Sequence, residues 1–351
     1  MNIWSSATYR KDIEGTLQRV DTRFLKDKRI LITGASGLIC SAIVDLLICC
    51  NLKNDAGITI YAAGRSVEKL TARFSHGLNA GLIPVEYDAT KNVCFDFSSD
   101  YIIHGASNAS PDKYISEPVD TMLANIVGVS NLLNYAKTCG AQKTVYISSS
   151  EVYGVLTHGK PLREEEYGSV DILSDRASYP MGKRAAETMC ISYANQYGLN
   201  VSIVRPGHIY GPTAQKSDKR VSSAFAYQAA AGKNLVMKSA GTQIRSYCHC
   251  IDCATAILTI LLKGRNKEAY NISNPDSIIT IRQMAETIAD CAGVELRIDI
   301  PDSEEKTVFN PMNNSSLNSR KLACLDWHNI YDSERGFRHT ISVMKECLDK
   351  F

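Results

Sequence analysis

Two short stretches of the chain combine residue types that can move a proton. The stretch "SYPMGKRAAE" contains Tyr179 and Lys183, whose i, i+4 spacing would place both side chains on one face of a helix. A phenol with its ordinary pKa of about 10 is a poor base near neutrality, and an ammonium group one turn away lowers that pKa. The stretch "YISSSEVYG" (146–154) adds Ser149, expected at a strand end, whose hydroxyl can bond and orient the same substrate hydroxyl. The pattern predicts that Tyr179 removes the proton of an alcohol while that alcohol is oxidised.

Such an oxidation needs a hydride acceptor, and the stretch "TGASGLIC" (33–40) is suited to bind one. It follows a β-rich run and opens a helical run, which is the context of a dinucleotide-binding loop. Gly34 permits the tight turn, and Gly37 lets the backbone approach a pyrophosphate at the positive end of the helix. Cys40 stands where a third glycine normally allows close helix–strand packing, and cysteine is small enough to be accommodated by a slight shift. We therefore expect a nicotinamide dinucleotide here, with a merely structural turn as the alternative.

The residues after the second and third expected strands bear on which dinucleotide binds. In "YAAGRS" Arg65 is present and the carboxylate that would bond the ribose diol of NAD is missing. An arginine can pair with a 2′-phosphate, which slightly favours NADP, whereas the alternative is a solvent-facing arginine. Asp88 is a candidate partner for the adenine, or a plain turn residue.

Strand-like and helical runs alternate along the first part of the chain and would position these residues. The strand-like runs are 29–33, 57–64, 83–89, 100–107, 143–149 and 200–207, with helices around 118–138 and 178–197 among those between them. This alternation predicts a Rossmann-type doubly wound parallel α/β sheet with its ligand at the carboxyl ends of the strands. We expect an N-terminal extension at 1–28 (a helix and a link without an assigned role), a dinucleotide-binding domain at 29–207 and a smaller α/β substrate-binding lobe at 208–351. Residues 268–274 are expected to return to the large sheet as one more strand.

Composition narrows the class of protein. Hydrophobic residues make up 44% and charged residues 22% of the 351 residues, and the formal net charge of +2 argues against a dedicated nucleic-acid binder. No apolar run reaches the roughly 18 residues of a membrane span, and the first 20 residues lack the apolar core of a signal peptide. The twelve cysteines are scattered, which is typical of reduced thiols in a cytoplasmic protein. The cluster "CHCIDC" (248–253) has no second Cys/His pair at zinc-finger spacing, so we predict a strand entering an apolar helix and no metal site.

Several stretches together resemble a known family. "ILITGASGLI", "HGASNASPDKY", "YISSSEVYG", "YPMGKRAAE", "VRPGHIYGP" and "GTQIRSYCHCIDC" resemble the extended short-chain dehydrogenases/reductases, the NAD-dependent epimerase/dehydratase family that acts on nucleotide sugars. The resemblance runs from about Lys28 to the C-terminus. It implies transient oxidation at C4 of a UDP- or dTDP-linked sugar by a bound nicotinamide cofactor, and it favours NAD. It also implies a homodimer formed through the helices near 118–138 and 178–197.

The residues at 149–151 help to choose among the reactions of that family. Sugar-nucleotide 4,6-dehydratases look like Thr-Asp-Glu there, and Ser150 is far too weak an acid to replace the aspartate. The 4-epimerases resemble Ser149 but usually lack the acid at Glu151. UDP-glucuronate decarboxylases (UDP-xylose synthases) look like Thr/Ser-Ser-Glu, which this chain matches, and "ASNASPDKY", "GKRAAETMC" and "SDKRVSSAF" resemble them as well. A decarboxylase is the first prediction, while a 4-epimerase, a 4,6-dehydratase and a 4-ketoreductase stay open.

The resemblance implies roles for individual residues. Tyr179, Lys183 and Ser149 would perform the oxidation, and Ser150 and Glu151 would manage protons near C5 and C6. The positions that resemble substrate contacts are Tyr114 in the sugar pocket, His208, Arg220, and Arg245 as partner of a carboxylate or phosphate. The positions that resemble cofactor contacts are Gly34, Ser36, Gly37, Leu38, Ile39, Arg65, Asp88, Ala106, Ser107, Asn125, Tyr179, Lys183 and Pro206.

Two positions depart from the decarboxylase pattern. The acid after the second strand is missing from "AAGRS", and His208 stands where the subgroup typically has an asparagine that contacts the nucleotide sugar. His208 can still donate one hydrogen bond, or it is a packed histidine at a strand end. A regulatory protein that binds the cofactor without turnover is a remote alternative, because relatives of that kind tend to lose the tyrosine or the lysine.

Overall fold

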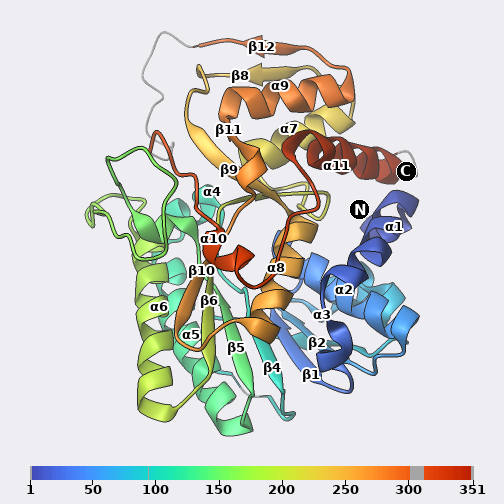
Figure 1. The fold of residues 1–351 in the computed structure, drawn as a ribbon, viewed down its shortest axis with the longest axis vertical. Helices are drawn as coiled ribbons and strands as arrows, with labels where there is room; N and C mark the ends of the chain where they lie inside the picture. The colour runs from blue at the N-terminus through green and yellow to red at the C-terminus, as the bar shows by residue number, and fades with distance from the viewer. Residues whose placement is uncertain (1, 94, 301–311, 349–351) are drawn as a thin grey trace.

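The computed structural model describes residues 2–93, 95–300 and 312–348, and a seven-stranded sheet lies at its centre (Figure 1). The strand order is β10–β6–β5–β4–β1–β2–β3, and neighbouring strands pair in parallel throughout. The strands are β1 (Arg29–Thr33), β2 (Thr59–Gly64), β3 (Leu82–Glu86), β4 (Tyr101–His104), β5 (Lys143–Ile147), β6 (Val201–Pro206) and β10 (Glu268–Ile272). The predicted Rossmann-type α/β fold is confirmed, and residues 268–272 form the edge strand β10.

Helices cover both faces of this sheet. Ile30 and Ile32 of β1 belong to a core shared with α2 (Leu38–Asn54) and α8 (Cys250–Lys263). Leu31, which points to the other face, belongs to a core shared with α5 (Pro118–Cys139) and α6 (Ser178–Tyr197). A strand buried on both sides explains why its sequence "RILIT" is apolar almost throughout. The shorter helices on this part of the chain are α3 (Val67–Arg73), η4 (Ser75–Gly77), α4 (Pro111–Ser116) and η5 (Ser150–Tyr153).

The later part of the chain forms a smaller lobe with its own core. One sheet has the order β11–β9–β7 and another pairs β12 with β8. These strands are β7 (His208–Tyr210), β8 (Leu235–Met237), β9 (Ile244–His249), β11 (Ile278–Thr280) and β12 (Leu296–Ile298). The helices of this part are α7 (Val221–Ala230), η6 (Pro275–Ser277), α9 (Ile281–Ala292), α10 (Arg320–Ala323) and α11 (Ser333–Leu348). The domain boundaries given above stay predictions.

The N-terminal residues lie between the two parts (Figure 1). They form η1 (Ile3–Ser5), α1 (Ala7–Thr16), η2 (Leu17–Arg19) and η3 (Thr22–Leu25). On one side the Tyr9 hydroxyl donates to the buried carboxylate of Asp45 on α2 (2.7 Å). On the other side Glu346 of α11 accepts hydrogen bonds from the Ser6 hydroxyl and the Ala7 amide, which begin α1.

Two local expectations can be compared with the structure. The segment "CHCIDC" is the end of β9 running into α8, with Cys248, Cys250 and Cys253 buried. Strand β5 ends at Ile147, so Ser149 lies after the strand and not on it. The reason is local: the Ser149 hydroxyl accepts a hydrogen bond from the Glu151 amide (3.2 Å) and caps η5, which turns the chain out of the sheet. In the described part of the chain, no helix is sufficiently long and apolar to cross a membrane.

Candidate active site

The glycine loop joins β1 to α2 at the carboxyl edge of the sheet. Gly34 has a φ of 68°, and a Cβ atom there would lie 2.8 Å from the carbonyl carbon of Gly105 and 2.9 Å from the amide nitrogen of Ala106. Only glycine therefore fits between this turn and the segment after β4. Gly37 is the N-cap of α2 and provides no side-chain cap, so the first-turn N–H groups of α2 are suited to an anionic ligand. This geometry fits a dinucleotide pyrophosphate.

Cys40 replaces the third glycine of the pattern, and the structure shows how it is accommodated. A Cβ atom on Gly105 would lie 2.4 Å from the Cys40 sulfur. The usual pattern makes room by a glycine on the helix at position 40. Here the glycine on the neighbouring segment, Gly105, makes room for the Cys40 side chain. A small residue on the neighbouring segment thus helps to accommodate Cys40, and the slight shift of the helix stays a prediction.

The other predicted cofactor residues lie in this loop, after strands of the large sheet, or on α5. Ser36, Leu38 and Ile39 lie in the loop and the first turn of α2, Ala106 and Ser107 follow β4, Asn125 lies on α5, and Pro206 ends β6. The Ser107 hydroxyl donates to the Asn125 side chain (3.2 Å), which brings these two residues together. Sequence reasoning missed Thr213 and Gln215, which donate to the backbone carbonyls of Leu38 (2.7 Å) and Ser36 (3.3 Å). The segment after β7 that contains Thr213 and Gln215 is thus hydrogen-bonded to the glycine loop and the start of α2.

Arg65 and Asp88 lie at the carboxyl ends of β2 and β3. Arg65 is exposed, as the structural alternative expected. The Asp88 carboxylate accepts hydrogen bonds from the amide and the hydroxyl of Thr90, which is the geometry of a turn. The Thr90 amide is the main influence that lowers the pKa of Asp88, and Arg65 contributes from a distance.

Tyr179 and Lys183 lie one turn apart on α6, and both are buried. The Lys183 ammonium donates to the backbone carbonyl of Ile147 (2.8 Å) and lies 5.8 Å from the centre of the Tyr179 ring. The Ser149 side chain lies near enough to Tyr179 to lower the pKa of its hydroxyl. The structure therefore brings the three predicted residues of the oxidation together.

The pKa of Tyr179 differs from the expectation. Burial raises it to about 12, and the lowering influences are the hydrogen bond with Ser149 and the charge of Arg220. Burial also lowers the pKa of Lys183 to about 7. Sequence spacing shows that the two residues are close, but it does not show how deeply they are buried, and burial dominates both values.

Glu151 lies in a polar cluster with a residue that sequence reasoning missed. Arg176, in the turn before α6, donates to the Tyr114 hydroxyl (2.8 Å) and lies 3.9 Å from a carboxylate oxygen of Glu151. The Tyr114 ring stacks on the Tyr179 ring, with centroids 5.0 Å apart. An arginine three residues before the tyrosine was visible in the sequence, but nothing local indicated its partners. Ser150, between Ser149 and Glu151, is buried in η5.

Three further predicted substrate residues face the same region. Arg245 is 3% exposed and donates to the carbonyl of Ile244; burial lowers its pKa, and Tyr247 and then Glu151 oppose this effect. Arg220 forms an ion pair with Asp218 (2.5 Å) at the start of α7. Burial first, then Arg245 and Arg220, lower the pKa of His208 to about 3, so this histidine is neutral near pH 7. The site therefore combines the phenols of Tyr114 and Tyr179, the carboxylates of Glu151 and Asp218, and several guanidinium groups.

Known proteins with similar sequences were found over most of the chain. The family described as "NAD dependent epimerase/dehydratase family" matches residues 30–273. UDP-glucuronic acid decarboxylase 3 from Arabidopsis thaliana is 33% identical over 300 residues, which cover 85% of this chain and 84% of that protein. UDP-glucuronic acid decarboxylase 1 from Xenopus tropicalis is 29% identical over 338 residues, which cover 93% of this chain and 75% of that protein. An NAD-dependent family does not support the slight preference for NADP that Arg65 suggested.

Solved structures show the same fold. A UDP-glucose 4-epimerase from Thermotoga maritima aligns with a TM-score of 0.76 and 23% identity, covering 91% of this chain and 99% of that one. The dTDP-glucose 4,6-dehydratase DesIV from Streptomyces venezuelae aligns with a TM-score of 0.77 and 21% identity, covering 92% and 98%. On the sequence match and the shared fold, the chain belongs to the NAD-dependent epimerase/dehydratase family.

Proposed function

We propose that this protein is a nucleotide-sugar decarboxylase that converts UDP-glucuronate to UDP-xylose through a transient ketone at C4. One observation carries the proposal: three arginines act on the residues of the site. Arg176 lies 3.9 Å from Glu151, the charge of Arg220 acts on Tyr179, and the charge of Glu151 acts on Arg245. The residue between Ser149 and Glu151 is Ser150, an alcohol and not an acid. UDP-glucuronate carries a diphosphate and a C6 carboxylate, which need cationic partners, and its decarboxylation needs no acid to protonate a leaving hydroxyl. The similarity to UDP-glucuronic acid decarboxylases supports the same reaction.

The glycine loop, Asp88, the segment 106–107 and Asn125 would hold NAD, because the uncapped start of α2 and the close approach of Gly34 to the segment after β4 fit a dinucleotide. When bound, NAD supplies a hydride acceptor at C4 and returns the hydride in the last step. NADP would in addition need a partner for its 2′-phosphate, and Arg65, which follows β2, is the residue that the sequence offers.

The residues of this chain would move the protons. Tyr179 takes the proton of the C4 hydroxyl, and Ser149 orients that hydroxyl. The C4 ketone lies β to the carboxylate, so the C5–C6 bond breaks, carbon dioxide leaves, and the electron pair forms an enolate. A proton then adds at C5, and Tyr179 returns its proton to the C4 oxygen. Glu151, which lies 3.9 Å from Arg176, is placed to transfer the proton that adds at C5.

Burial has a role in this scheme. Burial raises the pKa of Tyr179 to about 12, whereas its hydroxyl must be ionised before it can accept the C4 proton, and Ser149 and then Arg220 act in that direction by lowering the pKa. Arg245 pairs with a substrate carboxylate or phosphate, since its guanidinium is buried and donates to the neighbouring carbonyl of Ile244.

Product analysis tests the reaction. The protein is incubated with NAD and, separately, with UDP-glucuronate, UDP-glucose and dTDP-glucose, without added reductant, and the products are examined by mass spectrometry and chromatography. Loss of carbon dioxide from UDP-glucuronate is the expected result. Loss of water from a neutral hexose would instead indicate a 4,6-dehydratase, and an isomer of unchanged mass would indicate a 4-epimerase.

The variant Tyr179→Phe separates catalysis from cofactor binding. We expect it to abolish turnover and to leave the affinity for NAD, measured by calorimetry, nearly unchanged. Turnover equal to that of the unaltered protein would refute the assignment of Tyr179 as the base. Absence of turnover in both proteins, with NAD bound, would favour the regulatory alternative.

We also propose that the protein is a homodimer that pairs through α5. Val119, Leu123 and Val127 are exposed at i, i+4 and i+8 on this helix, with 68%, 41% and 39% exposure. Such a stripe is suited to pack against an identical helix of a second copy. Light scattering coupled to size exclusion should give twice the chain mass, and Leu123→Glu should give the mass of one chain; a single-chain mass for both would contradict the proposal.

A further inference from the structure

A buried carboxylate lies directly behind the candidate catalytic residues and has no part in the reaction proposed above. Glu187 follows Lys183 by one turn on α6 and is 8% exposed. It accepts a hydrogen bond from the Ser148 hydroxyl (2.5 Å) and two from Arg205, through Nε (3.0 Å) and Nη2 (2.6 Å). A buried ion of this kind is costly unless every bond is made, so its position is closely determined.

These contacts join two successive residues of the chain to two successive turns of one helix. The Ile147 carbonyl accepts from Lys183 (2.8 Å), and the next residue, Ser148, donates its hydroxyl to Glu187. The Ser148 amide in turn donates to the carbonyl of Val204 in β6 (2.8 Å). The residue that follows is Ser149. The register between the helix that carries Tyr179 and the segment that carries Ser149 is therefore set at this point.

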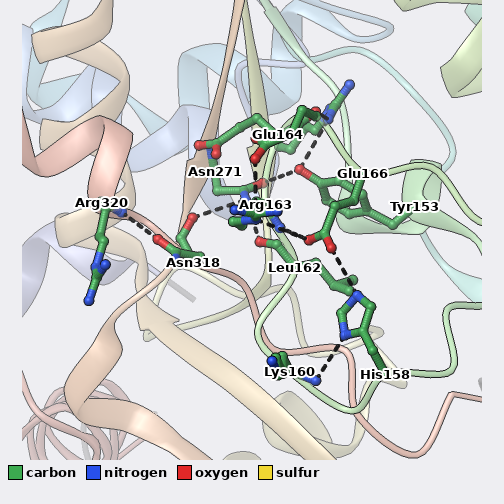
Figure 2. Close-up of polar contacts among 12 residues, drawn as sticks. Tyr153, His158, Lys160, Leu162, Arg163, Glu164, Glu166, Asn271, Asn318 and Arg320 are labelled. Carbon is green, nitrogen blue, oxygen red and sulfur yellow. Dashed lines mark hydrogen bonds and ion pairs between the residues drawn. The ribbon is translucent and has the colours of Figure 1, made fainter.

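Arg205 anchors Glu187 in the rest of the protein. Its side chain is 2% exposed, and Nη1 also donates to the Tyr153 hydroxyl (3.0 Å). Tyr153 donates to Asn271 of β10 (2.6 Å), whose amide group donates to the carbonyls of Leu162 and Asn318. Figure 2 shows this outer half of the network, in which Asn271 lies between Tyr153 and the chain segments of Leu162 and Asn318. The carboxylate of Glu187 is thus held from behind by several elements.

We propose that Glu187 is a positioning residue for the oxidation at C4: held by Arg205, its carboxylate fixes Ser148, and with it Ser149, against the helix of Tyr179 and Lys183. This inference rests on the proposed function for its catalytic consequence. Its electrostatic consequence does not depend on the substrate.

The surroundings of Lys183 make Glu187 important for its charge. Burial lowers the pKa of Lys183 to about 7, and the charge of Glu187 is the largest influence that raises it. The titratable groups around the ammonium are Cys40 from α2, His104 from β4, Tyr146 from β5, and Tyr179, Glu187 and Cys190 from α6. Glu187 is the one carboxylate in this group, and burial raises the pKa of both thiols. Without Glu187 the lysine would lose its proton at a lower pH.

The test uses the full chain with Glu187→Gln, and Thr188→Ala as the matched control on the exposed side of the same helix turn. Lysine labelled with ¹⁵N or ¹³C is titrated by NMR, and Lys183→Met identifies the Lys183 signal. We expect the midpoint of Lys183 to fall by roughly half a pH unit or more in Glu187→Gln and to stay unchanged in Thr188→Ala. With UDP-glucuronate, kcat should fall about 10- to 100-fold with KM changed little, because alignment is lost while binding groups remain.

Glu187→Gln leaves the Arg205 charge without its carboxylate and can prevent folding. The double variant Glu187→Gln/Arg205→Met removes both charges with little change of volume, and the Lys183 midpoint is expected to fall less, because the lost Arg205 charge offsets part of the lost carboxylate charge. An unchanged kcat in the folded variants overturns the positioning role, and an unchanged Lys183 midpoint in Glu187→Gln overturns the electrostatic one. If the unaltered protein decarboxylates no sugar nucleotide, the proposed function fails, while the titration still tests the role of Glu187.

Discussion

The pairing of Cys40 with Gly105 allows a quantitative test of how the dinucleotide loop packs. In Gly105→Ala the new methyl carbon would lie 2.4 Å from the Cys40 sulfur, against about 3.5–4 Å for an ordinary contact. Gly105 is not among the glycines with positive φ, so the substitution adds no backbone strain. The overlap must be relieved by moving a close-packed helix or loop, and we expect a loss of about 1–3 kcal/mol in the free energy of unfolding.

The same methyl group should be tolerated once the sulfur is removed. In Cys40→Gly the remaining close neighbours of that methyl carbon are the Ile147 Cδ1 atom and the Thr33 carbonyl oxygen, both at 3.2 Å. Cys40→Gly alone should cost about 1–2 kcal/mol, through a lost buried thiol and a glycine in a helix. In the Cys40→Gly background, the loss of unfolding free energy caused by Gly105→Ala should be smaller by roughly 1 kcal/mol or more than in the unaltered protein.

Urea unfolding of the four proteins of this cycle, followed by circular dichroism, measures the coupling. The expected result is a double variant that is more stable than the sum of its single changes predicts. If Gly105→Ala lowers the free energy of unfolding equally with cysteine and with glycine at position 40, then the Cys40 sulfur does not require a glycine at position 105. That result would refute the proposed packing. Gly15→Ala, at an exposed position of α1 where a Cβ atom would meet nothing within 4 Å, is a control for replacing a glycine without positive φ and should not couple to Cys40.

Three further outcomes follow from the structure. Arg176→Gln should lower kcat/KM about 10- to 100-fold, because it removes a charged partner of Glu151 and the donor to Tyr114, and an unchanged value would remove Arg176 from the site. Asp45→Asn should cost about 3 kcal/mol of unfolding free energy, since it leaves Arg73 beside a buried neutral amide, and thermal unfolding that matches the unaltered protein would contradict this. Burial and then the charge of Lys183 lower the pKa of His104 from 6.5 to about 3, so the unfolded chain binds a proton that the folded protein does not, and stability is lost as the pH falls through that range. His104→Gln should therefore flatten the fall of the melting temperature between about pH 6 and 4, and an equally steep fall would refute the assignment.

Local patterns in the sequence were sufficient to predict the fold and part of the site. The apolar runs of β1 and β6 and the turn residues after them predicted a parallel sheet, because strands buried on both faces must be apolar throughout. The spacing of Tyr179 and Lys183 predicted their common face, because four residues make about one helical turn. These signals are short-range, and so they are visible in one sequence.

Contacts between distant segments left no such signal. Arg176 meets Tyr114 across a long stretch of chain, and Thr213 reaches the loop at Leu38 from another lobe. The compensation of Cys40 by Gly105 has the same character, since neither residue is unusual alone. The pKa of Tyr179 was misjudged for a related reason: depth of burial is a property of the assembled core and not of a motif.

The attachment of the N-terminal residues to both parts of the molecule restricts how a ligand can be captured. The Tyr9 hydroxyl donates to Asp45 of α2, the Asp12 carboxylate contacts the imidazole of His339 on α11, and the Ser6 hydroxyl donates to Glu346. A hinge motion that opened the smaller lobe would break these bonds at the same time. The binding site at the carboxyl edge of the sheet is therefore preorganised by folding. Binding a ligand there does not have to order the two parts of the molecule, so this entropy loss does not weaken the affinity.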